Sequence, residues 1–146
     1  MQKGFSFRAR VLGLAGLLPQ LVCLVAVFDD NTRFIALSGA FLYAALILSF
    51  LGGLWWGLAV AAPNAPRWIY GAAVVPSLLA MVSGIPWMIG STWPGPSLAF
   101  LGIAIIVALS VDVRLARLDL MPDWMLRLRI MLSAGLGLST LALAAL

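Results

Sequence analysis

The chain has 146 residues and a formal net charge of +4, and 64% of its residues are hydrophobic while only 10% are charged. Soluble domains contain roughly 45–50% apolar and about 25% charged residues. So few charges cannot cover the surface of a soluble domain, and the composition therefore predicts an integral membrane protein. The chain has no histidine, and its acidic residues are all aspartates. These counts exclude a His-ligated haem, a zinc site with histidine ligands and a Ser-His-Asp triad.

Five apolar stretches follow one another along the chain, separated by short polar or proline-containing breaks. A helix needs about 20 apolar residues to cross roughly 30 Å of hydrocarbon at 1.5 Å of rise per residue. We therefore expect one domain over residues 1–146, an all-α bundle of five transmembrane helices. The expected helices cover residues 11–28, 34–62, 68–90, 97–117 and 122–146.

The basic residues predict how this bundle is oriented. With five spans, the N-terminus and the second and fourth loops share one side of the membrane, and only Arg33 falls on the other. The positive-inside rule then places the N-terminus inside and the C-terminus outside. The basic residues are scattered without interleaved aromatics, so we expect no nucleic-acid partner. The residues on the inner side are Lys3, Arg8, Arg10, Arg67, Arg114, Arg117, Arg127 and Arg129.

The first apolar stretch also has the basic start and apolar core of a signal peptide. The small-x-small cleavage pattern is missing before Asp29, so we expect this segment to remain as a helix. The few polar residues before it are too short for a mitochondrial transit peptide. The expected location is therefore the bacterial inner (cytoplasmic) membrane, with the lipid bilayer as the surrounding partner.

The second helix carries small side chains at every fourth position. Such small-xxx-small patterns let helix backbones approach closely in lipid. The pattern fits packing against another helix of the same chain, which we favour, or a face that binds another inner-membrane protein or a second copy. Pro76 in the third helix is also expected at a packing position. The small residues are Ala45, Ser49, Gly53, Gly57 and Ala61, with Gly52 beside them.

Three residues are candidates for contact with an apolar ligand. Trp55 and Trp56 lie beside the small-residue pattern and would offer an aromatic wall to a quinone, a tetrapyrrole or a lipid. Gln20 follows Pro19 within the first helix, where it either satisfies a carbonyl freed by a proline kink or contributes to a binding site. We prefer aromatic girdles and a plain kink, and we expect no cofactor and no metal.

The fourth loop is the region richest in charged residues. The fourth helix is short from Ser97 to Val111, and so it is expected to continue past Asp112 towards Arg117. This places the Asp112 carboxylate at the inner edge of the hydrocarbon, where an isolated charge is costly. We therefore expect an ion pair between Asp112 and Arg129 of the fifth helix, the alternative being two solvated anchors.

Four segments resemble a bacterial and mitochondrial family of five-span proteins that includes human transmembrane protein 69. The segments are LGLAGLLPQ at 12–20, LSFLGGLWWGLA at 48–59, YGAAVVPSLLA at 70–80 and MPDWMLRLRIMLS at 121–133. The resemblance implies a five-span inner-membrane protein without an established activity. A basic residue is usual in the family at the place of Trp55. The positions that match the family pattern are Gly52, Gly53, Trp56, Gly57, Pro76, Pro122, Trp124 and Arg129.

Two functions remain open from the sequence. The first is a non-enzymatic accessory or assembly partner that acts through helix–helix packing, because the apolar cores hold no catalytic group. The alternative is a small carrier or sensor that binds an apolar ligand between kinked helices. Deep lateral openings beside the tryptophans would favour the carrier, whereas a flat outer face of small residues would favour the assembly partner.

Overall fold

A computed structural model describes the backbone of residues 2–146 and the side chains of residues 7–146. The side chain of Lys3, counted above with the inner basic residues, lies outside the described residues. All regular elements in the described backbone are helices, which confirms the all-α class. They are α1 (Gln2–Ala15), α2 (Leu18–Ala26), α3 (Arg33–Ala61), α4 (Trp68–Ser83), α5 (Ile85–Met88), α6 (Gly95–Arg117) and α7 (Asp123–Ala145).

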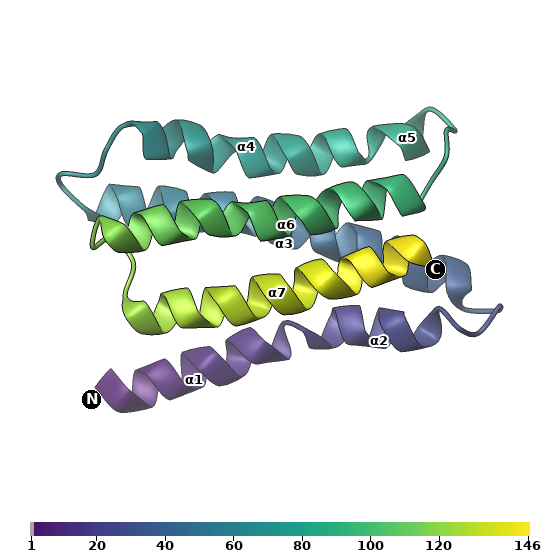
Figure 1. The fold of residues 1–146 in the computed structure, drawn as a ribbon, viewed down its shortest axis with the longest axis horizontal. Coiled ribbons are helices and arrows are strands. Elements are labelled where there is room, and N and C mark those ends of the chain that lie inside the picture. Colours follow the sequence, from purple (N-terminus) through teal and green to yellow (C-terminus); the bar gives the residue numbers. More distant parts are fainter. Residues whose placement is uncertain (1) are drawn as a thin grey trace.

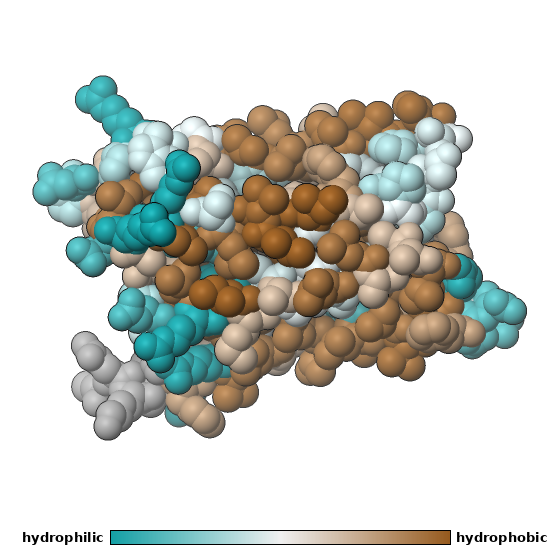
Figure 2. Space-filling view, viewed as in Figure 1, coloured by the Kyte–Doolittle hydropathy of each residue, from teal (hydrophilic) through white to brown (hydrophobic). Residues whose placement is uncertain are grey.

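Five helical segments are long and apolar enough to cross a membrane, as the sequence predicted. The helices run antiparallel along one axis, with α6 packed on α7 and α4 packed on α3 (Figure 1). Figure 2 shows hydrophobic side chains across the middle of one face and hydrophilic ones gathered towards the two ends. The segments span Phe7–Ala26, Arg33–Ala61, Trp68–Met88, Gly95–Arg117 and Asp123–Ala145.

The two ends of the bundle differ in charge. The N-terminus and the α3–α4 and α6–α7 connections lie at one end, and the C-terminus and the other two connections lie opposite (Figure 1). We call the first the basic end. Outside the Asp112–Arg129 pair described below, its arginines are Arg8, Arg10, Arg67, Arg114, Arg117 and Arg127, against Asp119 and Asp123. The opposite end holds Arg33 with Asp29 and Asp30.

The first span consists of two helices, where the sequence suggested one helix bent at Pro19. α1 ends at Ala15, a turn follows, and Pro19 lies in the first turn of α2, where its missing N–H costs no helical hydrogen bond. The break therefore comes before the proline. The Tyr43 hydroxyl of α3 donates a hydrogen bond to the Gly16 carbonyl oxygen, which gives this half-buried carbonyl a partner outside its own span.

Proline also shapes the third span. Pro76 stays inside α4, and its side chain is buried against α3. The span is interrupted at Gly84, and α5 begins with Pro86 in its first turn. Gly90, which ends this segment, has a φ of +67°, a left-handed conformation that favours glycine.

The centre of the bundle is the shared face of α3, α6 and α7. Leucine and isoleucine side chains from α3 and α6 interlock there with almost no exposed area, and Leu136 and Leu143 of α7 close the layer. The outward faces of the same helices carry exposed side chains such as Phe50 and Val107. The buried residues of α3 and α6 in this layer include Leu48, Leu51, Leu98, Leu101 and Ile105.

Only the first part of the small-residue pattern of α3 packs within the chain. Ala45 and Ser49 are half-buried, and the Ser49 hydroxyl lies 3.0 Å from the Ser77 hydroxyl of α4. Gly53, Gly57 and Ala61 are exposed instead. The reason is helical geometry, because four residues advance the side chain by about 400°, so each repeat drifts by about 40° around the helix.

Gly52 is the glycine that brings α3 and α4 together. A Cβ atom added at Gly52 would lie 2.1 Å from the carbonyl oxygen of Ala73 and 3.5 Å from Pro76 Cγ. A Cβ atom added at the neighbouring Gly53 would meet nothing within 4 Å. The close approach of α3 and α4 therefore depends on Gly52, one residue away from the repeating pattern.

The adjacent glycines allow a matched test of this contact. Gly52→Ala should lower the melting temperature in detergent clearly, because the backbones of α3 and α4 must move apart. Gly53→Ala makes the same chemical change and should leave the melting temperature within about a degree or two or raise it slightly, since alanine is the better helix former. Equal melting temperatures for the two variants would contradict the assigned contact.

Candidate functional site

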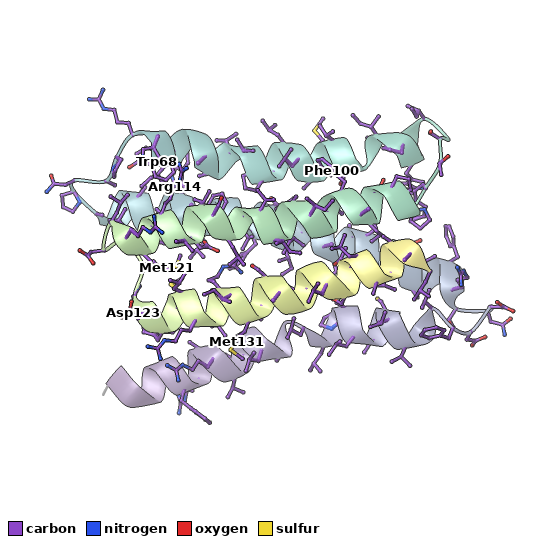
Figure 3. The ribbon with its side chains drawn as sticks, in the orientation of Figure 1. Trp68, Phe100, Arg114, Met121, Asp123 and Met131 are labelled. Atoms are coloured by element: carbon purple, nitrogen blue, oxygen red, sulfur yellow. The ribbon has the colours of Figure 1, made fainter. Side chains whose placement is uncertain are left out.

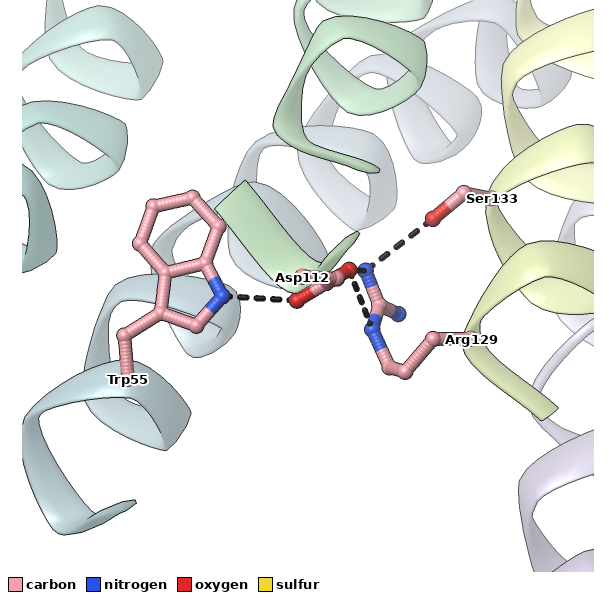
Figure 4. Close-up of polar contacts among 4 residues, drawn as sticks. All are labelled: Trp55, Asp112, Arg129 and Ser133. Carbon is pink, nitrogen blue, oxygen red and sulfur yellow. Dashed lines mark hydrogen bonds and ion pairs between the residues drawn. The ribbon is translucent and has the colours of Figure 1, made fainter. Parts of the chain in front are cut away.

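A cluster of four polar side chains is buried between α3, α6 and α7, near the basic end. Asp112 of α6 is at its centre and is 0% exposed. Its two carboxylate oxygens have different partners (Figure 4). The Trp55 indole Nε1 donates to Oδ1 at 2.8 Å, and the Arg129 Nε donates to Oδ2 at 3.1 Å.

Arg129 of α7 completes the cluster. Its Nη2 atom lies 3.1 Å from the same Asp112 Oδ2 and donates a further hydrogen bond of 3.0 Å to the Ser133 hydroxyl. Ser133 lies one turn further along α7 and is fully buried. The aspartate therefore receives hydrogen bonds from two helices, and the arginine is held in place by a neighbour on its own helix.

The depth of the cluster explains why each charge needs a partner. Asp112 lies five residues before the end of α6 at Arg117, or about 7.5 Å at 1.5 Å per residue. Arg129 lies six residues after the start of α7 at Asp123, or about 9 Å. Both groups therefore lie more than a turn inside the helix ends, where removing an ion from water costs several kcal/mol. Pairing and hydrogen bonding offset that cost.

A second polar contact joins the first span to the last. Gln20 of α2 is fully buried, and its Nε2 atom donates a hydrogen bond of 2.8 Å to the Thr140 hydroxyl of α7. The Thr140 hydroxyl in turn donates to the Leu136 carbonyl oxygen. Gln20 Oε1 is buried and has no hydrogen-bond partner among the described residues. Gln20 therefore contacts α7 and does not serve the carbonyl groups of its own helix.

The two adjacent tryptophans have different surroundings. Trp55 points inward to Asp112, whereas Trp56 is 47% exposed and packs edge-on against Tyr70 of α4, with ring centroids 5.0 Å apart. An apolar cavity of about 200 Å³ lies beside Trp55, between α3, α4 and α6, and Pro76 also lines it. The structure therefore does not bring Trp55, Trp56 and Gln20 together into one site.

Sequence reasoning identified some members of these contacts and missed others. It singled out Asp112 and Arg129, which the structure brings together, because charged residues inside apolar helices are rare. It missed the hydrogen bond from Trp55, since tryptophan near a helix end is typical of the membrane interface. Ser133 follows Arg129 by four residues, and that spacing was an available signal. Thr140 gave no signal for its contact with Gln20.

Metal ligands do not gather in this part of the molecule. Within the described residues, no three cysteine or aspartate side chains lie close enough together to hold a metal ion. Both carboxylate oxygens of Asp112 accept hydrogen bonds within the cluster, while Arg129 also lines a pocket between α1, α3 and α7. Chemically the cluster is an ion pair that joins three helices.

Comparison with known proteins identifies a family. A family described as "Protein of unknown function (DUF3429)" matches residues 6–145, so the chain belongs to it. This confirms the expectation of a family without an assigned function. Neither the curated proteins nor the solved structures give a significant match to the chain.

The ion pair can be tested by a double-mutant cycle. Asp112→Asn and Arg129→Gln should each destabilise the protein by about 3–5 kcal/mol, because each leaves a buried charge without its partner. The double variant should lose much less than the sum of the two, since contacting residues are not additive. Thermal unfolding in detergent measures all three.

Two controls accompany this cycle. Trp55→Phe keeps the ring but removes the donor to Oδ1, and should cost about 1–3 kcal/mol. Arg127→Gln removes an exposed arginine two residues from Arg129 and should cost little. Additive losses for Asp112→Asn and Arg129→Gln would show that the two side chains do not act as a pair.

Proposed function

We propose that this protein is a non-enzymatic accessory or assembly partner in an inner membrane, and that it binds a transmembrane helix of another subunit against the inner half of α3. The observation that carries the proposal is the bare backbone at Gly53 and Gly57. A Cβ atom added at either glycine would meet nothing within 4 Å, and both residues are exposed.

The residues around these glycines give the face its shape. Leu46 and Phe50 precede them on the same side of α3 and are 58% and 66% exposed, and Val60 follows at 65%. The helix surface therefore has a shallow depression at the two glycines, with larger side chains projecting on either side. Association in lipid depends on van der Waals packing and close backbone approach, and bare glycines between bulkier side chains provide both.

The buried polar cluster around Asp112 supports a structural role of this kind. Asp112 and Arg129 neutralise each other, and Trp55 and Ser133 occupy further hydrogen-bonding groups of the pair. Such a cluster fixes the rotation of α3 relative to α6 and α7. A partner helix would then meet the glycine face at one defined angle.

A carrier or sensor for an apolar ligand is the second candidate, and the cavity beside Trp55 favours it. Its volume of about 200 Å³ decides against a large ligand. Pockets for drug-sized molecules measure roughly 300–1,000 Å³, so a tetrapyrrole would require the helices to separate. A single ring is smaller, because an apolar cavity of about 150 Å³ already binds benzene. Mass spectrometry of lipophilic molecules in the purified protein would detect such a ligand.

We place the basic end on the cytoplasmic side of a bacterial inner membrane. The arginine surplus at the end shared by the N-terminus and the α3–α4 and α6–α7 connections supports this orientation, because cytoplasmic loops retain Lys and Arg. A reporter fused after Leu146 should therefore be active in the periplasm, and one inserted at Arg67 should be active in the cytoplasm. Cytoplasmic activity of the Leu146 fusion would contradict the orientation.

The partner face can be tested by crosslinking in the membrane. A photoreactive amino acid at Gly57 should give a discrete protein adduct in cells, and Gly53→Leu should abolish that adduct without changing the melting temperature, since the side chain enters free space. The adduct mass also distinguishes another protein from a second copy of this 15.5 kDa chain.

Gly71 of α4 provides the matched control. It too is exposed with nothing within 4 Å of an added Cβ atom. Gly71→Leu should leave the adduct at position 57 intact. If position 57 crosslinks to lipid alone, or if Gly71→Leu removes the adduct as effectively as Gly53→Leu, the proposed face is wrong.

A further inference from the structure

A groove between α1 and α7 opens at the basic end of the bundle. It encloses about 280 Å³, which corresponds to about nine water molecules at about 30 Å³ each. This volume accommodates a phosphate group and the first carbons attached to it. The residues that line the groove are Arg10, Leu14, Trp124, Arg127, Leu128 and Met131.

The charges in the groove are all of one sign. Arg10 comes from α1 and Arg127 from α7, and no carboxylate lines the groove with them. Asp123, labelled in Figure 3 at the start of α7, precedes Arg127 by one turn. The ion pair found among the side chains of residues 7–146 is Asp112–Arg129, so Asp123 makes no direct ion pair with Arg127. Two guanidinium groups beside one cavity repel each other, and a bound anion would relieve that repulsion.

The rest of the groove is apolar and leads towards the middle of the bundle. Leu14 lies one turn beyond Arg10 on α1, and Met131 lies one turn beyond Arg127 on α7, between the two helices in Figure 3. Each turn advances about 5.4 Å along the helix axis, towards the hydrophobic middle of the bundle. Trp124 lies one turn before Arg127, at the start of α7 and the basic end of the bundle, at the depth typical of interfacial tryptophan. The groove therefore changes from cationic to apolar in the direction in which a lipid changes from headgroup to acyl chain.

We infer that this groove is a binding site for an anionic phospholipid. Arg10 and Arg127 bind the phosphate, since the guanidinium group donates paired hydrogen bonds to phosphate oxygens. An acyl chain lies against Leu14, Leu128 and Met131. A soluble phosphate compound would use the two arginines but would leave these apolar side chains uncovered. The site is independent of the glycine face on α3, so either can be present without the other.

Native mass spectrometry of the whole protein in a neutral detergent tests this inference. Phosphatidylglycerol should bind more tightly than phosphatidylcholine with the same acyl chains. The double variant Arg10→Gln/Arg127→Gln should weaken phosphatidylglycerol binding by about tenfold or more, because each arginine near a membrane surface is worth about 1 kcal/mol towards anionic lipid. Both side chains are exposed, so the melting temperature without lipid should stay unchanged.

The control is Arg67→Gln/Arg117→Gln, which removes the same charge from exposed positions at the same end but outside the groove. It should retain phosphatidylglycerol binding within about twofold. A tenfold loss in this control would show diffuse attraction to the basic end and would overturn the site. Displacement of the lipid by millimolar inorganic phosphate would show a site for free phosphate and would overturn the role of the acyl chain. Unchanged binding by Arg10→Gln/Arg127→Gln would overturn the inference altogether.

Discussion

The carboxylate of Asp112 is buried away from water, and three helices are arranged so that its charge and its hydrogen-bonding oxygens have partners. Arg129 supplies the opposite charge from α7, and Trp55 supplies a hydrogen bond from α3. A single buried charge is costly, whereas a pair with its hydrogen bonds satisfied is tolerated. The hydrogen bonds to Asp112 can form at one relative rotation of the three helices, because each donor lies on a fixed face of its helix. The apolar layer of leucines and isoleucines beyond it fills the space that this rotation leaves.

The first span is held differently from the others. Few of its residues are buried and it consists of two helices, although side chains such as Leu17 and Leu24 pack against the core. Two hydrogen bonds contribute as well, from Gln20 to Thr140 and from Tyr43 to the Gly16 carbonyl oxygen. In lipid such bonds add to packing, with measured values of about 0.6–2 kcal/mol each. The groove between α1 and α7 exists because the first helix of this span meets α7 without filling the space beside it.

The number of spans and the continuation of α6 beyond Asp112 could both be predicted from the sequence. The thickness of the hydrocarbon sets the length of a spanning helix, and the cost of an isolated charge predicts that Asp112 has a partner. The sequence was not sufficient where a feature depends on the rotation of a helix. The small residues of α3 repeat every four positions, but Gly52, outside the repeat, makes the close contact with Ala73. The partner of Gln20 is 120 residues away in the chain, and no local pattern indicates it. At the break before Pro19, the Gly16 carbonyl oxygen accepts its hydrogen bond from Tyr43 of a different helix.

The positions of Asp112 and Arg129 along the chain bear on how the protein enters the membrane. The two residues are 17 positions apart, in consecutive helices joined by a short connection. A lone charge at the centre of an inserting helix costs roughly 2.5–3.5 kcal/mol, and the cost falls towards the membrane edge. If α6 entered the membrane alone, its insertion would include the free-energy cost of an unpaired Asp112 until α7 inserted. Entry of α6 and α7 together as a helical hairpin would neutralise both charges during insertion, so the pair favours insertion of the last two spans as one unit.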